Sequence, residues 1–199
     1  MRVLAFSDLH HSAKQAKEIV AAAKEADLVI GAGDFCNMRQ DLDGAMGLLA
    51  GIDAPFVLVP GNAESVDELV KAAPESAHVL HGTGVEVGGV RLFGLGYGVP
   101  VTPFGAWSCD LSEEQASEML DACEGADILV LHSPPLGAVD RTSGGLSVGS
   151  AAILAAIERV QPKLALCGHI HDSWGQSAMV GRTKVVNLGP FANWFDLSQ

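Results

Sequence analysis

The sequence has few basic residues for its length. Its 199 residues include 12 Lys and Arg against 24 Asp and Glu, which gives a formal net charge of −12. A protein that holds nucleic acid by neutralising many phosphates needs clustered Lys and Arg. The composition therefore disfavours long nucleic acid as a partner, and any phosphate chemistry must find its positive charge elsewhere.

Long hydrophobic runs are also absent. The apolar stretch after Arg2 ends at Ser7, which is shorter than the hydrophobic region of a signal peptide. No uninterrupted apolar run approaches the roughly 18 residues that a membrane helix needs. The four cysteines contain no CxxC pair, which favours reduced thiols over a disulfide framework. We therefore expect a cytoplasmic protein without a membrane partner, whose oligomeric state the sequence does not indicate.

The sequence is rich in apolar residues. Hydrophobic residues make up 48% of the chain and charged residues 18%, a balance that argues against disorder. A chain of this length buries enough surface for one domain with a sizeable core. Because no repeat, linker or low-complexity tract interrupts it, we predict a single domain over residues 1–199.

Short apolar runs alternate with helix-length amphipathic segments, which is typical of an α/β sheet with crossover helices. The predicted strands are 1–6, 28–30, 56–59, 128–131 and 164–167. The predicted helices are about 12–25, 40–50, 64–73, 112–122 and 149–160. Two further regions, 78–95 and 176–188, resemble antiparallel hairpins around Gly turns. Residues 96–110 form a long loop with its own aromatic residues, and loops of that length are often functional.

Residues of metal-ligating types follow each of the five predicted strands. Ligands of open α/β sheets bind beyond the carboxyl ends of the strands, so these side chains should gather at one rim. Oxygen and imidazole donors suit Mn, Fe, Zn, Ni or Co better than a thiolate-rich structural site would. Two pairs, Asp8 with His10 and His169 with His171, are spaced so that extended backbone would point both members to one side. One pocket could then hold more than one ion.

Five blocks in order carry a family resemblance. They are Asp8-x-His10, Gly33-Asp34-x-x-Asn37, Gly61-Asn62-x-Glu64, His132 and Gly168-His169-x-His171. This set resembles the signature of the calcineurin-like metallophosphoesterase superfamily, in particular its small prokaryotic-type phosphodiesterase branch. The resemblance implies an α/β fold, a four-layer α-β-β-α sandwich with two mixed β-sheets and a metal site at the C-terminal rim of the strands.

The resemblance also implies two divalent metal ions and a role for each ligand. The first ion would be held by Asp8, His10 and His171, and the second by Asn62, His132 and His169. Asp34 would bridge the two, because a carboxylate has two oxygens. Asp34, Asn62 and His132 are also the expected catalytic residues. Mn²⁺ is the favoured metal, with Fe, Zn, Ni and Co left open because ligand type alone does not separate them.

The implied activity is phosphoester hydrolysis by in-line attack of a metal-bridging hydroxide on a small phosphoester. The third block departs from the pattern of most catalytic members, where a His that assists the leaving group stands at the position of Ala63. General acid assistance is typically worth about 10²–10⁴-fold. We therefore expect phosphodiesters with good leaving groups to be the preferred substrates. The alternatives are a phosphomonoesterase or phosphoprotein phosphatase, and a non-catalytic metal-binding scaffold.

Ala63, Phe104, Trp107 and Arg141 are the candidate substrate contacts. The two aromatic side chains could stack on a base or an aryl group, or they could pin the long loop to the surface. Arg141 could bind a phosphate bidentately or pair with a neighbouring carboxylate, Asp140 or Asp172.

Three other histidines are candidates to replace the missing leaving-group donor. They are His11, His78 and His81. We favour a position at the rim for His11 and structural roles for His78 and His81. Cys36 and Cys167 lie beside motif residues, and we interpret both as small buried packing residues.

Overall fold

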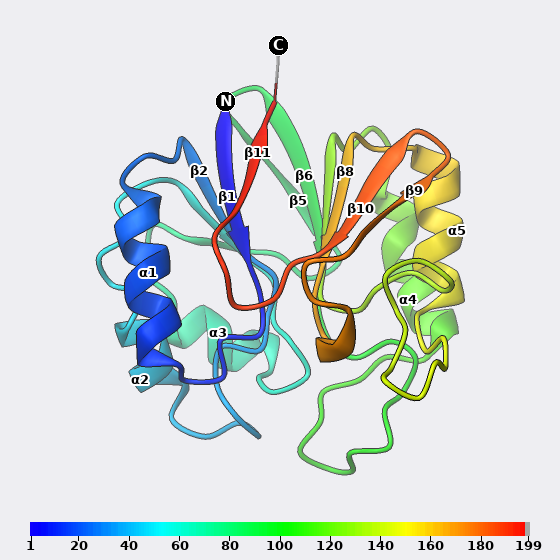
Figure 1. Cartoon of the computed structure of the whole chain (residues 1–199), viewed down its shortest axis with the longest axis horizontal. Helices are drawn as coiled ribbons and strands as arrows, with labels where there is room; N and C mark the ends of the chain where they lie inside the picture. Colours follow the sequence, from blue (N-terminus) through cyan, green and yellow to red (C-terminus); the bar gives the residue numbers. More distant parts are fainter. Residues whose placement is uncertain (198–199) are drawn as a thin grey trace.

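The computed structural model describes residues 1–197. They form two β-sheets that face each other, with helices on both outer sides (Figure 1). The four-layer α/β sandwich with two mixed sheets is therefore confirmed. None of the helices within the described residues has the length and apolar composition to span a bilayer.

The first sheet has five strands in the order β11-β1-β2-β3-β4. β1 to β4 run parallel, and β11 is antiparallel to β1. Three helices cover its outer face (Figure 1). The strands are β1 (Arg2–Phe6), β2 (Leu28–Gly31), β3 (Phe56–Leu58), β4 (His78–Val79) and β11 (Asn193–Asp196), and the helices are α1 (Ala13–Ala23), α2 (Leu42–Gly47) and α3 (Val66–Ala72).

The second sheet has six strands in the order β5-β6-β7-β8-β10-β9. The four inner strands are parallel and the two edge strands are antiparallel to their neighbours. The strands are β5 (Thr83–Val87), β6 (Val90–Leu95), β7 (Ile128–Leu131), β8 (Leu164–Cys167), β9 (Ser177–Val180) and β10 (Thr183–Asn187). The outer face carries α4 (Glu113–Leu120) and α5 (Ala151–Val160), and two short 3₁₀ turns cover Asp121–Cys123 and His171–Ser173.

Three helices begin at a serine whose side chain accepts a backbone hydrogen bond. Ser65 and Glu68 form a reciprocal capping box at the start of α3, and Ser112 and Gln115 form another at α4. Ser150 caps α5. These side chains satisfy amide groups that would otherwise lack a partner in the first helical turn, so they define where the helices begin.

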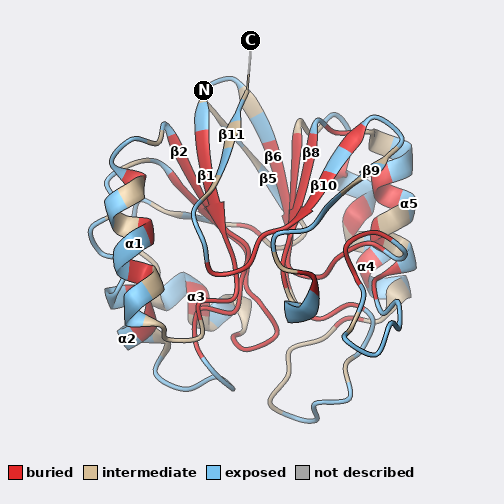
Figure 2. Ribbon diagram, viewed as in Figure 1, coloured by how far each residue is buried: buried red, intermediate tan, exposed pale blue. Residues whose placement is uncertain are grey.

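Four of the strands, β1, β2, β7 and β8, are mostly continuous apolar runs because both of their faces are buried (Figure 2). Side chains along a strand alternate between the faces of the sheet. In β1, Val3 and Ala5 pack between the two sheets, whereas Leu4 and Phe6 pack against the α1 side. This explains why the sequence shows runs rather than alternation at these positions.

The structure corrects three details of the predicted topology. The five ligand-bearing strands do not share one sheet, because β1, β2 and β3 belong to the first sheet and β7 and β8 to the second. The hairpins are present as β5–β6 and β9–β10, but His78–Val79 pairs with β3 instead of joining the hairpin. β11 was not predicted from the sequence. Its alternating burial marks it as an edge strand with one covered face.

Candidate metal centre

The carboxyl ends of β1, β2, β3, β7 and β8 meet at the lower end of the molecule in Figure 1. There they bring metal-ligating side chains from both sheets into two groups. Asp8, His10 and His171 form the first group, and Asp34, His132 and His169 form the second. Within each group the potential ligand atoms lie within 4.8 Å of one another.

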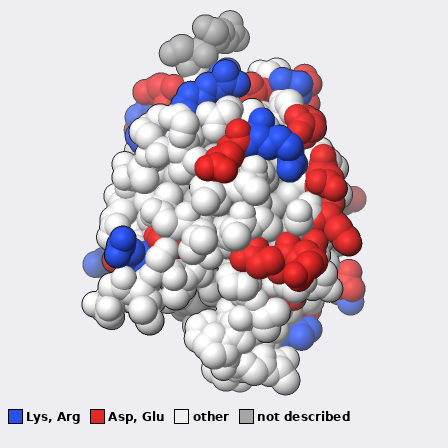
Figure 3. All heavy atoms as spheres, turned by 90° about the vertical axis from the view of Figure 1, so that its right-hand side faces the viewer, with Lys and Arg blue, Asp and Glu red and all other residues white. Residues whose placement is uncertain are grey.

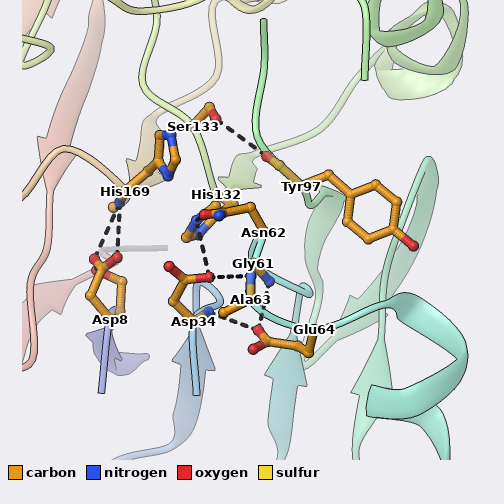
Figure 4. A network of polar contacts seen from close by, with 12 residues as sticks. Asp8, Asp34, Gly61, Asn62, Ala63, Glu64, Tyr97, His132, Ser133 and His169 are labelled. Carbon is orange, nitrogen blue, oxygen red and sulfur yellow. Dashed lines mark hydrogen bonds and ion pairs between the residues drawn. The ribbon is translucent and has the colours of Figure 1, made fainter. Parts of the chain in front are cut away.

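Asp34 faces both groups. Its Oδ1 lies 3.4 Å from His132 Nε2, and its Oδ2 lies 3.6 Å from His10 Nε2. Asn62 joins the second group, because its Oδ1 lies 3.2 Å from His132 Nε2. Figure 4 shows the carboxylates of Asp8 and Asp34 side by side, close to His169 and His132. All seven predicted ligands are thus at one place, and Asp34 has the position of a bridge.

Four of these seven residues have a left-handed backbone. The φ angles are 54° at Asp8, 44° at His10, 57° at Asp34 and 68° at His169. The prediction that extended backbone aligns each ligand pair was therefore wrong, although the pairs do converge. A left-handed conformation costs energy in residues other than glycine and is concentrated at functional sites.

Gly33 makes the turn before Asp34 possible. Its φ is 90°, and a Cβ atom there would lie 2.5 Å from the backbone nitrogen of Gly61. The loops after β2 and β3 therefore touch through their backbones. This contact brings Asp34 and Asn62 to the same side of the centre.

Glu64 holds together the loop after β2 and the loop after β3. Its Oε1 accepts hydrogen bonds from the backbone amides of Asp34 and Gly61, each at 2.7 Å. The backbone amide of Ala63 donates to Asp34 Oδ1 at 2.8 Å. Burial and the charge of Asp34 raise the pKa of Glu64 to about 7, against the opposing effect of the amide of Gly61. Glu64 was part of the sequence signature, but its positioning of Asp34 is visible only in three dimensions.

Trp174 supports the first group and was missed by sequence reasoning. Its indole Nε1 donates to Asp8 Oδ2 at 3.1 Å, and its ring centroid lies 4.2 Å from that of His171. Ser7 Oγ also donates to Asp8 Oδ2. Burial by itself would raise the pKa of Asp8, but hydrogen bonding to His171, the charge of His132 and the Ser7 hydroxyl lower it to about 2.

The buried acidic side chains of the centre require positive charge. Asp8 and Asp34 are almost fully buried, and within the described residues their ion-pair partners are histidines rather than Lys or Arg. Burial disfavours the charged form of His132, yet Asp34 and Asp8 raise its pKa. Since buried charges must be compensated, the buried carboxylates of Asp8 and Asp34 favour a bound cation. The oxygen and imidazole donors fit such ions.

A cavity of about 360 Å³ opens over the centre. One wall is aromatic, because the rings of Phe104 and Trp107 stack with centroids 5.7 Å apart and Phe104 lies 6.3 Å from the His169 ring. Thr142, Ile170 and Asp172 also line the cavity. Thr142 belongs to the segment 140–150, which the sequence offers as a candidate for substrate contacts, whereas Ile170 and Asp172 were not predicted to line the cavity. Thr142 comes from the loop before α5, Ile170 lies between His169 and His171, and Asp172 lies in the 3₁₀ turn that His171 begins, so tertiary structure brings the three together.

The remaining predicted contacts lie outside the cavity. Ala63 is buried and contributes its backbone amide to Asp34, as described above. The Arg141 guanidinium donates to the carbonyl of Gly145 at 3.2 Å. Within the described residues, Arg141 forms an ion pair with neither Asp140 nor Asp172.

The side chains of the other histidines and of Cys36 and Cys167 belong to neither ligand group. His11 Nε2 lies 3.1 Å from the Gln40 carbonyl at the rim. His81 Nδ1 accepts from the Gly96 amide, and His78 lies on β4. Cys36 and Cys167 are buried, as predicted, and burial raises the pKa of both thiols.

Comparison with known proteins defines the class of this fold and site. The calcineurin-like phosphoesterase superfamily domain matches residues 1–199. The chain therefore belongs to the calcineurin-like phosphoesterase superfamily, whose members depend on two metal ions. The donor set described above fits that requirement.

Curated relatives and solved structures agree with this family. The human metallophosphoesterase domain-containing protein 1 is 36% identical over 137 residues, which cover 65% of this chain and 39% of the human protein. The matched regions span 26–39% of the lengths of four curated relatives. The chain thus spans less than half of those proteins.

Three solved structures share the fold. Protein TT1561 of Thermus thermophilus has a TM-score of 0.73 at 20% identity, over 94% of this chain and 88% of that one. A dimetal phosphatase from Danio rerio has a TM-score of 0.67 at 14% identity, over 96% and 88%. An archaeal phosphodiesterase has a TM-score of 0.56 at 14% identity, over 95% and 84%. At these identities the likeness establishes the fold alone.

Proposed function

We propose that this chain is a dinuclear metal-dependent phosphoester hydrolase that prefers phosphodiesters of small size. The observation that carries the proposal is the pair of ligand groups, which share Asp34 between them. Asp8, His10 and His171 would hold one ion, and Asn62, His132 and His169 the other. Mn²⁺ is the ion that we favour.

The two ions, when bound, would lower the pKa of water for attack on phosphorus and neutralise the phosphate oxygens. The chain's own residues orient this chemistry. Glu64 holds the backbone amide of Asp34, the amide of Ala63 holds its carboxylate, and Trp174 and Ser7 hold the carboxylate of Asp8. Such outer hydrogen bonds fix the direction of metal ligands.

The preference for phosphodiesters rests on the missing proton donor. The methyl group of Ala63 is buried and supplies no donor. Apart from the ligands themselves, no histidine lines the cavity within the described residues. His11, His78 and His81 therefore do not replace the missing proton donor. The leaving group must then depart without assistance from an imidazole.

A leaving-group series tests the proposal. Purified protein is loaded with Mn²⁺, its metal content is measured, and rates are compared for aryl methyl phosphates whose phenols differ in pKa. We expect a steep decline in rate as the leaving-group pKa rises, and much weaker turnover of alkyl monoesters. A flat dependence would contradict the lack of acid assistance. Metal-loaded protein without turnover of any phosphoester would favour a scaffold.

The main enzymatic alternative is a phosphomonoesterase or phosphoprotein phosphatase. A dimetal phosphatase and a phosphodiesterase both share this fold, so the fold does not choose between the two activities. The proposed preference for diesters rests instead on the lack of a proton donor other than the ligands among the described residues that line the cavity. Equal efficiency on an aryl monoester and on the matched aryl methyl diester would favour the phosphatase.

A further inference from the structure

We infer that Phe104 and Trp107 form an aromatic platform that selects phosphodiesters bearing a neutral planar ring. This inference rests on the proposed function, since it names the substrate class of the same site. The platform would contact the substituent that stays on phosphorus, while the ions held by the two ligand groups would bind the phosphate.

The rings are placed beside the reacting centre. They stack almost parallel, with an interplanar angle of 10°, and both line the cavity that contains His10, Asp34 and Asn62. Phe104 contacts the His169 ring edge-on and leaves 50% of its surface exposed. An exposed aromatic surface next to a polar cavity is unfavourable in water and is typical of a site that takes an apolar group.

The alternative role, pinning the long loop to the surface, is already filled by polar groups. Thr102 Oγ1 and Ser108 Oγ donate to the two oxygens of Asp110, at 2.9 and 3.0 Å. These bonds hold the loop closed on either side of the aromatic pair. The rings are therefore not needed to close it.

The closed loop is also attached to a metal ligand. Asn62 Nδ2 donates to Ser108 Oγ at 3.1 Å, and the amide of Cys109 donates to the Asn62 carbonyl at 2.9 Å. The amide oxygen of Asn62 consequently points to His132. The aromatic platform and the second ligand group thus form one connected unit, which fixes the ring surface relative to the phosphorus position.

The charge of the cavity indicates that the ring of the substrate should be neutral. Its lining contains no Lys or Arg among the described residues, but it does contain Asp172. Residues 96–109 carry no charged side chain, and the lower end of the molecule, where this loop protrudes, is mostly uncharged (Figure 3). Nothing beyond the ions would neutralise a second anionic group, so a neutral ring is favoured over a charged one.

Two substrates with the same leaving group test the inference. 4-Nitrophenyl phenyl phosphate and 4-nitrophenyl methyl phosphate both release 4-nitrophenolate, and they differ only in the group that remains. Phe104→Ala and Trp107→Ala should each lower kcat/KM for the phenyl substrate about 5–150-fold, the range of aromatic stacking contacts, mainly through KM. The methyl substrate should change little. Intrinsic reactivity differs between the substrates, but this difference cancels when a variant is compared with the wild type.

Val101→Ala is the matched control, because Val101 is an exposed apolar residue of the same loop that does not line the cavity. It should leave both substrates unchanged. A third substrate with a 4-carboxyphenyl group should be turned over less efficiently than the phenyl compound by the wild type. Equal losses on the phenyl and methyl substrates, or no loss on either, would overturn the inference.

A binding measurement separates this inference from the proposed function. Monomethyl phenylphosphonate and monomethyl methylphosphonate are titrated calorimetrically into the metal-loaded protein. Wild type should bind the phenyl compound more tightly, and Phe104→Ala should abolish that preference. Lack of turnover with this binding preference intact would reject the hydrolase but retain the platform. Turnover without the binding preference would retain the hydrolase and reject the platform.

Discussion

The two ligand groups differ in how deeply they lie in the protein. In the first group, the side chains of His10 and His171 are 26% and 50% exposed. In the second group, His132 is fully buried and the Asp34 side chain is 6% exposed. Asp8 of the first group is as buried as Asp34, so the two groups differ in their histidines, which lie at the rim in the first group and include the fully buried His132 in the second.

This difference arises from what holds each histidine. His132 follows β7 directly, and its Nδ1 donates to the carbonyl of Ala32 at 2.8 Å, which fixes the ring from the opposite sheet. His171 lies in a 3₁₀ turn and packs on the Trp174 ring. Since electrostatic attraction is stronger where water is excluded, we expect the second group to bind its ion more tightly and release it more slowly.

The largest expected effect comes from breaking the link between the groups. Asp34→Asn retains the size of the side chain but removes the charge that faces both. We expect the metal content to fall from two ions to one or none and phosphodiesterase activity to fall by roughly 10³-fold or more, because metal assistance is worth several kcal/mol. Metal analysis and kcat/KM on 4-nitrophenyl methyl phosphate measure both.

Asp172→Asn is the control for that substitution. Asp172 also lines the cavity, but it belongs to neither ligand group. This variant should keep two ions and most of its activity on 4-nitrophenyl methyl phosphate. If Asp34→Asn retained two ions and full turnover, the bridging position would have no functional meaning.

Metal removal sharpens the comparison. Each bound ion stabilises the fold by about 2.7 kcal/mol when free metal is 100 times its Kd. For a domain of this length, each kcal/mol of lost stability lowers the Tm by about 2–4 °C. After addition of a chelator, we expect the ion of the first group to leave first, which gives two phases in metal content measured over time.

The fluorescence of Trp174 should show which of the two phases belongs to the first group. Its indole contacts Asp8 and His171 of the first group, so the fluorescence of a Trp107→Phe, Trp194→Phe variant, in which Trp174 is the single tryptophan, should change in the fast phase. A single phase, or a fluorescence change confined to the slow phase, would contradict the difference between the groups.

Removing one outer hydrogen bond should weaken the first group alone. Trp174→Phe keeps an aromatic ring beside His171 but loses the indole donor to Asp8. Loss of such an outer partner typically costs about 10–100-fold in metal affinity. Calorimetric titration of metal-free protein should show this loss for the weaker ion and no change for the tighter one. Trp194→Phe is the matched control, because Trp194 lies on β11 under Arg2. A loss at both sites would point to general disturbance.

Much of this architecture was predictable because the strands are buried on both faces. The runs 28–30, 128–131 and 164–167 match β2, β7 and β8 within one residue. The ligands follow these runs directly, so locating the strands located the ligands. The two sheets were implied by the family resemblance that the five blocks carry, since an alternating α/β pattern by itself does not distinguish two sheets from one.

What sequence reasoning missed depends on tertiary contacts. Trp174 gives no local signal, since it lies three residues beyond His171 and acts on Asp8, which is far away in the chain. The left-handed backbone at Asp8 and His169 accompanies contacts between loops, in which the amide of Asp8 donates to the carbonyl of Gly33 and the amide of His169 donates to Asp8 Oδ1. The part of Ala63 that matters is its amide, which any residue except proline would supply.

The smallest expected effect concerns a histidine outside both groups, and it separates acid sensitivity of the fold from that of the centre. Burial lowers the pKa of His81 to about 4, whereas an unfolded histidine titrates near 6.5. The unfolded chain therefore takes up the proton first, so the stability that His81 contributes is complete above pH 6.5 and is lost as the pH falls towards 4.

Protonation would also break the hydrogen bond that His81 Nδ1 accepts from the Gly96 amide. His81→Gln can retain an acceptor but does not titrate. Because His81 is partly exposed, we expect an effect of only about 1 kcal/mol, or about 2–4 °C in Tm. Between pH 7 and 4.5, metal-free wild type should lose that much more Tm than His81→Gln, whereas His78→Gln should follow the wild type. Parallel losses in all three proteins would mean that the ligand groups, rather than His81, set the acid sensitivity.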